Sequence, residues 1–243
     1  MTAAAATPTA QPSLRRRLLT VARFPFGMVI ITLRYLWHYR AFVRVNVAGD
    51  ASDLPADLPP RWVDDRVKPL PKGHGPLFRR SFTVRMTGSD VDAAGLMDRL
   101  VQDLDRAAPS EVVTFRKIRG ELGTLEEGDE YRVRIPAPWD GPVRVVHRDA
   151  TSFRFTTLRG HLEAGQIEFR AVDEGPGAVR FEIETWSRAG TPLARLAFVE
   201  LGVGREVQLN MWAQFCLAMP RLARARRSGR IRITTRRWDG VGS

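Results

Sequence analysis

The feature that most constrains this chain is a run of six short strand-like segments between residues 112 and 187. Polar and apolar residues alternate within the segments, as Phe181, Ile183 and Thr185 do with their neighbours, which is the period of a strand with one covered face. The turns between the segments are too short to hold crossover helices. The run therefore predicts an antiparallel meander and excludes a parallel doubly wound sheet.

Helical patterns lie on both sides of the meander. After a further strand-like segment at 77–86, a helix is predicted from Ser89 or Asp90 to about Ala107. A longer amphipathic helix is predicted from about 191 to 225. Its apolar residues recur at every fourth position: Val207, Met211, Phe215 and Met219. This order predicts an α+β fold in which a curved antiparallel sheet of six to seven strands surrounds the C-terminal helix and leaves room for a ligand.

A compact motif lies inside the meander. It reads Thr157-Leu158-x-Gly160-His161-x-Glu163-x-Gly165-x-x-x-Phe169, with Ser187-Arg188 further on. Over about residues 115–220 the chain resembles an uncharacterised family of bacterial and plant proteins, domain-of-unknown-function family nineteen-ninety. That family is similar to the START-like superfamily of helix-grip proteins, which includes polyketide cyclases and lipid-transfer domains. The resemblance implies the helix-grip fold but no activity, and the chain departs from the family in having Gln166 and Ile167 where an acidic pair is usual.

Two interpretations of the motif remain open. His161, Glu163 and Glu168 form the one compact cluster of candidate acid–base groups, so they could act in a ligand cavity or as a catalytic base of the cyclase type. Alternatively, the motif forms a corner between strands, in which Gly160 and Gly165 permit the turns while His161 and Glu163 hold loop backbone. The abundance of glycine favours the corner.

Four further residues are candidates for contact with a ligand. Trp186 and Arg188 come near the end of a strand, where they could line the mouth of a cavity, and Met211 and Phe215 could face its interior. Ordinary core packing is the alternative for each aromatic or sulfur-containing side chain. The single cysteine and four scattered histidines predict no metal site, and no phosphate-binding loop or catalytic triad order is present, so no cofactor is expected.

The net charge of +11 is confined to the two ends of the chain. Residues 1–49 contain seven arginines and no acidic residue, and residues 221–238 contain eight arginines and no acidic residue. The segment 50–220 between them carries a slight negative charge. Cationic ends on a nearly neutral body predict an anionic partner, either a membrane surface or a nucleic acid.

The N-terminal end favours a membrane surface. We expect residues 1–12 to be disordered and residues 13–48 to form a basic aromatic helix outside the main domain. Arg34 interrupts the apolar stretch, so a spanning helix is disfavoured. A helix that packs on the domain is the alternative to one that lies on a membrane. The candidate membrane-contact residues are Arg15, Arg16, Arg17, Arg23, Phe26, Arg34, Trp37 and Tyr39.

The remaining boundaries follow from composition. Residues 49–76 contain six prolines and are predicted to be a linker, residues 77–225 form the helix-grip domain, and residues 226–243 form a basic tail. The function favoured by these patterns is noncatalytic binding of a lipid or other hydrophobic small molecule by a cytoplasmic protein attached to the inner face of a membrane. The alternatives are a cyclase or hydratase that uses His161 with Glu163 or Glu168, and a nucleic-acid-associated protein. The oligomeric state is not predicted.

Overall fold

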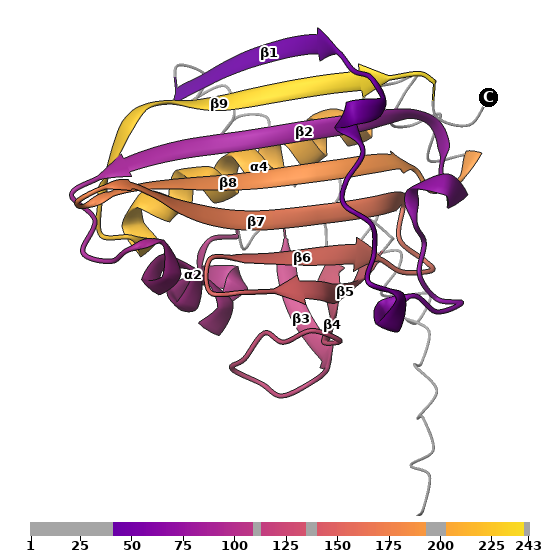
Figure 1. Ribbon diagram of the computed structural model, residues 1–243, viewed down its shortest axis with the longest axis horizontal. Coiled ribbons are helices and arrows are strands. Elements are labelled where there is room, and N and C mark those ends of the chain that lie inside the picture. The colour runs from indigo at the N-terminus through magenta and orange to yellow at the C-terminus, as the bar shows by residue number, and fades with distance from the viewer. Residues whose placement is uncertain (1–40, 109–112, 135–139, 193–202, 241–243) are drawn as a thin grey trace, which may run out of the picture.

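The computed structural model describes residues 41–108, 113–134, 140–192 and 203–240. Within them, one sheet has the strand order β1-β9-β2-β8-β7-β6-β5-β4-β3 (Figure 1). The strands are β1 (Phe42–Ala48), β2 (His74–Thr87), β3 (Thr114–Arg119), β4 (Glu130–Arg134), β5 (Asp140–Arg148), β6 (Ser152–Thr157), β7 (Glu163–Gly175), β8 (Ala178–Ala189) and β9 (Arg226–Trp238). The helices are α2 (Ala93–Gln102) and α4 (Val203–Leu222).

The α+β class is confirmed, but the predicted sheet of six to seven antiparallel strands is wrong. The described residues form nine strands, and the outermost pair, β1 with β9, is parallel. The strands of the predicted meander do pair antiparallel with their neighbours in sequence. The additional strands come from both ends of the chain, where the sequence predicted a helix and a tail.

Alternation along the strands gives the sheet two different faces. Phe82 on β2 lies opposite Ile183 on β8, and both side chains are fully buried in the main core. Residues an odd number of positions away on the same strands, such as Arg79 and Glu184, point the other way. We call the face that carries Phe82 the inner face and the face that carries Arg79 the outer face.

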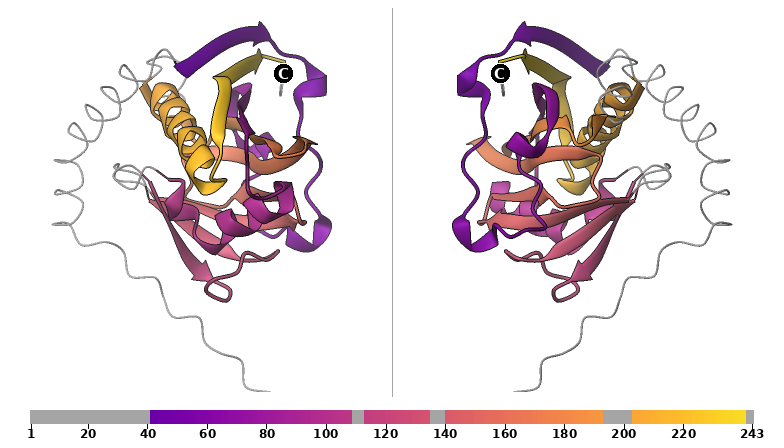
Figure 2. Two further views of the ribbon diagram at one scale, coloured as in Figure 1. Left: turned by 90° about the vertical axis from the view of Figure 1, so that its left-hand side faces the viewer. Right: turned by 90° about the vertical axis from the view of Figure 1, so that its right-hand side faces the viewer.

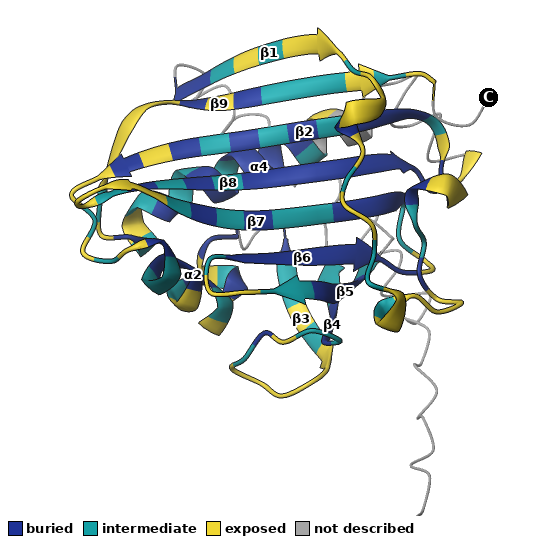
Figure 3. Ribbon diagram, viewed as in Figure 1, coloured by how far each residue is buried: buried dark blue, intermediate teal, exposed yellow. Residues whose placement is uncertain are grey.

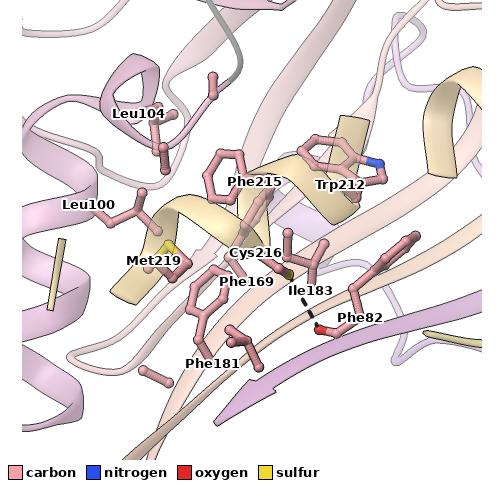
Figure 4. Packing of buried hydrophobic residues seen from close by; sticks show 14 of the residues in the cluster. Phe82, Leu100, Leu104, Phe169, Phe181, Ile183, Trp212, Phe215, Cys216 and Met219 are labelled. Atoms are coloured by element: carbon pink, nitrogen blue, oxygen red, sulfur yellow. Dashed lines mark hydrogen bonds between the residues drawn. The ribbon is translucent and has the colours of Figure 1, made fainter. Parts of the chain in front are cut away.

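Helix α4 packs on the inner face, and the sheet curves around it as in a helix-grip fold (Figure 2). Aromatic rings fill the contact: Phe169 on β7 lies 4.7 Å from Phe153 and 5.5 Å from Phe215 of α4, measured between ring centroids (Figure 4). Helix α2 contributes Leu96 and Leu100 to the same core. It begins at an Asp92 cap and ends at Gln102, so it is shorter than predicted at both ends.

The N-terminal helix predicted over 13–48 is wrong for its last residues, since Phe42–Ala48 is strand β1. Valines at positions 43, 45 and 47 give this segment the period and β-branched composition of a strand. Phe42 is buried in the core, and Arg44 reaches back to Glu206 on α4 at 3.1 Å. The rest of the predicted helix and the expected disorder over 1–12 lie outside the described residues.

The predicted basic tail is also wrong, because Arg226–Trp238 is strand β9, which lies between β1 and β2. Ile231 and Ile233 are buried on the inner face. The arginines that surround them conceal the strand pattern when net charge alone is considered. This long cationic segment is therefore a strand with a neighbouring strand on each side.

The predicted linker over 49–76 is part of the folded structure. Residues 49–73, which we call the strap, cross the outer face in three short 3-10 turns and lie in front of the sheet in Figure 1. Buried Asp53 accepts a hydrogen bond from Arg79 at 2.9 Å, and Arg144 donates one to the Trp62 carbonyl at 3.0 Å. With the strap on one face and the core on the other, strand β6 is buried at every position (Figure 3).

Candidate functional site

A polar cluster lies between α4 and the inner face of the sheet. Gln208 is on the buried side of α4, four residues before Trp212 and seven before Phe215. Its amide nitrogen donates to the carboxylate of Glu163 on β7 at 2.6 Å, and its amide oxygen accepts a hydrogen bond from Arg80 on β2. One glutamine therefore links the helix to an acidic and a basic side chain of two different strands.

Inner-face positions of β8 extend this cluster. Thr185 lies opposite Arg80 in the strand register, and Ser187 is two residues further along. The Ser187 hydroxyl hydrogen-bonds to the Glu163 carboxyl group. The Thr185 hydroxyl is almost completely buried, and among the described residues it has no hydrogen-bond partner. The same holds for the indole N–H of Trp212, one helical turn beyond Gln208.

Burial sets the protonation of Glu163. Removal of the carboxyl group from water raises its pKa above the usual range, while Arg80 and the Ser187 hydroxyl oppose that rise. Gln208 donates a hydrogen bond to the Glu163 carboxyl group and accepts one from Arg80. These hydrogen bonds stabilise the carboxyl group at a position from which water is excluded. The cluster contains both hydrogen-bond donors and acceptors beside an aromatic core.

His161 lies at the turn before β7, and its ring contacts backbone. Its Nδ1 accepts a hydrogen bond from the Glu163 N–H at 3.0 Å, so the carboxylate of Glu163 does not orient the imidazole. The ring lies over Gly141, where a Cβ atom would come within 2.9 Å of Nε2. Burial, together with the positive charge of Lys68, lowers the pKa of His161 to about 4. The ring is therefore neutral at neutral pH.

Other residues of the motif attach the strap to this turn. The Thr157 hydroxyl donates to the Lys68 carbonyl at 2.9 Å and accepts from the Gly165 N–H at 3.0 Å. The Lys68 ammonium group donates to the His161 carbonyl at 2.8 Å. At Gly165, a Cβ atom would lie 1.9 Å from the Trp186 carbonyl oxygen. These contacts correspond to the corner interpretation, except that the Glu163 side chain reaches α4 and not the loop.

Glu168 is not part of the cluster. It is five residues after Glu163, so the two side chains leave β7 on opposite faces. On the outer face, Glu168 lies 3.5 Å from Arg170. His161 therefore contacts the backbone of Glu163 and not its carboxylate, and Glu168 lies away from both residues.

Trp186 and Arg188 also lie on the outer face. Trp186 packs with Leu70 of the strap and Leu77, and Arg188 donates to the Gly75 carbonyl at 2.9 Å. The reason is the strand period: Thr185 and Ser187 face α4, so the residues between and after them point to the strap. These two candidates are therefore separated from the inner face by the sheet itself.

Met211 and Phe215 are on α4 as predicted, and both are buried in the main core. Phe215 contacts the rings of Phe169, Phe181 and Trp212 (Figure 4). No group of three or more histidine, cysteine or acidic side chains among the described residues could hold a metal ion. In that same part of the chain, no helix has the length and apolar character to cross a membrane.

Arg15, Arg16, Arg17, Arg23, Phe26, Arg34, Trp37 and Tyr39 lie outside the described residues.

Sequence reasoning missed Arg80, Thr185 and Gln208. The sequence contains a signal for two of them. Arg80 lies between Phe78 and Phe82 at the two-residue spacing that places all three on one face of a strand, and Gln208 is in helical phase with Trp212 and Phe215. A polar residue at a position where the pattern predicts an apolar one marks a buried polar group that requires a partner.

The model of the family described as Domain of unknown function (DUF1990) matches residues 78–216. Among solved structures, norcoclaurine synthase from Thalictrum flavum in complex with dopamine and hydroxybenzaldehyde is 12% identical, with a TM-score of 0.41 over 59% of this chain and 87% of that one. Ara h 8.0201 is 13% identical, with a TM-score of 0.40 over 59% and 97%. A conserved protein from Geobacillus kaustophilus is 7% identical, with a TM-score of 0.41 over 61% and 98%.

Among curated proteins, no significant match to the sequence is found. The family match begins at Phe78 in β2 and ends at Cys216 in α4, so it includes the motif around His161 and the polar cluster between sheet and helix. It covers more than half of the chain and confirms the resemblance seen in the sequence. The chain belongs to the DUF1990 family.

Proposed function

We propose that this protein binds a hydrophobic small molecule, such as a lipid, between α4 and the inner face of the sheet, without catalysis. The supporting observation is the Thr185 hydroxyl, which is buried without a partner beside the Glu163–Gln208–Arg80 cluster. An apolar body of the ligand would lie against Met211 and Phe215, and its polar group would reach Thr185 and the indole N–H of Trp212.

Buried polar groups without hydrogen-bond partners are costly in a protein core. A buried hydroxyl without a hydrogen bond destabilises a fold by about 1–3 kcal/mol, so native structures contain few of them. An acceptor or donor on a ligand would remove that penalty at Thr185. Ligand sites in proteins combine a mostly apolar lining with a few convergent polar groups. The core residues around Gln208 and Glu163 have this composition.

The geometry supports binding better than acid–base catalysis. A general base needs an available lone pair within reach of the substrate, and Nδ1 of His161 already accepts the Glu163 N–H. The Glu163 carboxyl group is engaged by Gln208, and Glu168 lies on the other face. The cyclase alternative therefore has no described pair of groups arranged for proton transfer.

Replacement of Thr185 by valine separates ligand binding from folding. Valine has nearly the shape of threonine without the hydroxyl, so the ligand-free Thr185→Val variant should be more stable by about 1 kcal/mol. Its affinity for a dansyl-labelled fatty acid should fall about fivefold, because one hydrogen bond to the ligand is lost. Thr83→Val is the matched control, since Thr83 is on the outer face of β2.

The measurements are fluorescence titration, chemical denaturation, and native mass spectrometry of the full-length protein as purified. Copurification of a hydrophobic molecule that Thr185→Val retains less well would support the proposal. Loss of stability in Thr185→Val together with unchanged binding would reject it, since the hydroxyl would then serve the fold alone. Absence of any bound molecule and of probe binding would reject it as well.

A further inference from the structure

The cationic C-terminal segment of the sequence lies close to one edge of the sheet, as strand β9. Strand β1 pairs in parallel with β9, and Phe42 lies opposite Ile231 in the register. Strand β1 is the outermost strand at this side of the described sheet. The first residue of β1 therefore lies beside the part of β9 that holds Arg230 and Arg232.

Four arginines near this junction are exposed. None of their side chains forms an ion pair or hydrogen bond with another described residue, and we call this group the arginine edge. Its members are Arg226, Arg227, Arg230 and Arg232. By contrast, arginines further across the sheet are neutralised, as Arg79 is by Glu184 at 2.5 Å and Arg180 is by Glu174 at 2.9 Å.

The neighbouring carboxylates of Glu174 and Asp90 do not compensate this charge. Glu174 already pairs with Arg85 and Arg180. Asp90 pairs with Arg99 at 2.7 Å and with Arg224 at 3.4 Å. Crowded like charges of this kind repel one another within a Debye length, so an external anionic partner would relieve the repulsion.

Apolar side chains lie next to the arginine edge. Val43 is opposite Arg232 in the register, and Val47, further along β1, is 43% exposed. Cationic groups beside exposed apolar ones match a lipid surface, which offers anionic headgroups above an apolar layer. Nucleic acid offers phosphate without that layer.

We infer that the arginine edge is a docking surface for an anionic membrane. Each arginine near such a surface strengthens binding by a factor of about five, so removal of four should weaken it at least about a hundredfold. The attraction is electrostatic and should decrease steeply as salt is added.

The test compares two full-length variants that carry the same net charge. One replaces the arginine edge with glutamine at all four positions. The matched control replaces exposed arginines on loops and strands away from β9 with glutamine: Arg106, Arg116, Arg119 and Arg159. Circular dichroism and thermal denaturation verify that both variants fold. Cosedimentation is measured with vesicles of phosphatidylcholine, with and without phosphatidylserine, and with duplex DNA and single-stranded RNA as competing polyanions.

The expected result is binding that requires phosphatidylserine, that the arginine-edge variant loses and that the control variant keeps. Equal losses in the two variants would overturn the inference, because net charge alone would then explain binding. Absence of vesicle binding by the unaltered protein would overturn it, as would salt-sensitive retention on nucleic acid without vesicle binding. The outcome is independent of ligand binding at Thr185, which lies on β8 within the core.

Discussion

Acidification should destabilise this protein through His161, and replacement by asparagine should remove that effect. The asparagine side-chain oxygen can take the place of Nδ1 and accept the Glu163 N–H, but it does not titrate in this range. The pKa of His161 falls from 6.5 to about 4 on folding, because the ring is buried and Lys68 is near. Between these values the folded protein binds fewer protons than the unfolded chain, so stability falls as the pH falls.

Linkage gives the magnitude. With pKa values of 6.5 in the unfolded chain and about 4 in the folded protein, the histidine contributes a loss of about 2 kcal/mol between about pH 8 and about pH 5. The wild type should therefore lose about 2 kcal/mol more than His161→Asn over this interval. Other groups titrate too, including Glu163, but they are common to both proteins and largely cancel in the difference.

Urea denaturation at the two pH values provides the free energies of unfolding. His74→Asn is the control for the loss of a histidine, since His74 is exposed at the start of β2. A difference between wild type and His161→Asn that stays constant within about 0.5 kcal/mol would refute the reasoning, because the ring would then not be a buried neutral acceptor.

Two further predictions concern the backbone. Gly165→Ala should destabilise the fold by about 3 kcal/mol or more, because its Cβ would lie 1.9 Å from the Trp186 carbonyl oxygen. Gly123→Ala, at a φ of +83° with open space around it, should lose only about 1–2 kcal/mol in urea denaturation, and equal losses would contradict the steric argument. A chain lacking residues 1–40 should unfold cooperatively, whereas one lacking 1–48 should have a lower Tm and aggregate, because β9 would become an open edge without Phe42 in the core. Identical melting curves for the two shortened chains would show that β1 does not support the sheet.

Local sequence patterns predicted the strands and the helix around the candidate site but not which residues form it. The sequence places Glu182, Glu184 and Trp186 on one face of β8, with Ile183 and Thr185 on the other. It does not say which face meets α4, so the position of Trp186 near the end of a strand is compatible with the mouth of a cavity. Once packing identifies Ile183 as a core residue, Trp186 must lie under the strap.

Gln208 makes contacts that could not be predicted from local sequence patterns. Its helical phase with Phe215 could be read from the sequence, but its partners Glu163 and Arg80 are 45 and 128 residues away. No local period encodes such a contact. The same is true of the strap, whose prolines are compatible with a flexible linker until Asp53 and Trp62 are seen to bond to the outer face.

The sequence by itself determined the α+β class, the antiparallel meander, the long C-terminal helix and the family, because these depend on residue periods and a contiguous motif. Only the tertiary structure decided that β1 pairs with β9, that the strap covers the outer face, and that Gln208 joins Glu163 to Arg80 beside Thr185. The physical reason is that strand pairing and helix docking are settled by long-range burial and hydrogen bonding, which compete over the whole chain and leave little trace in any single segment.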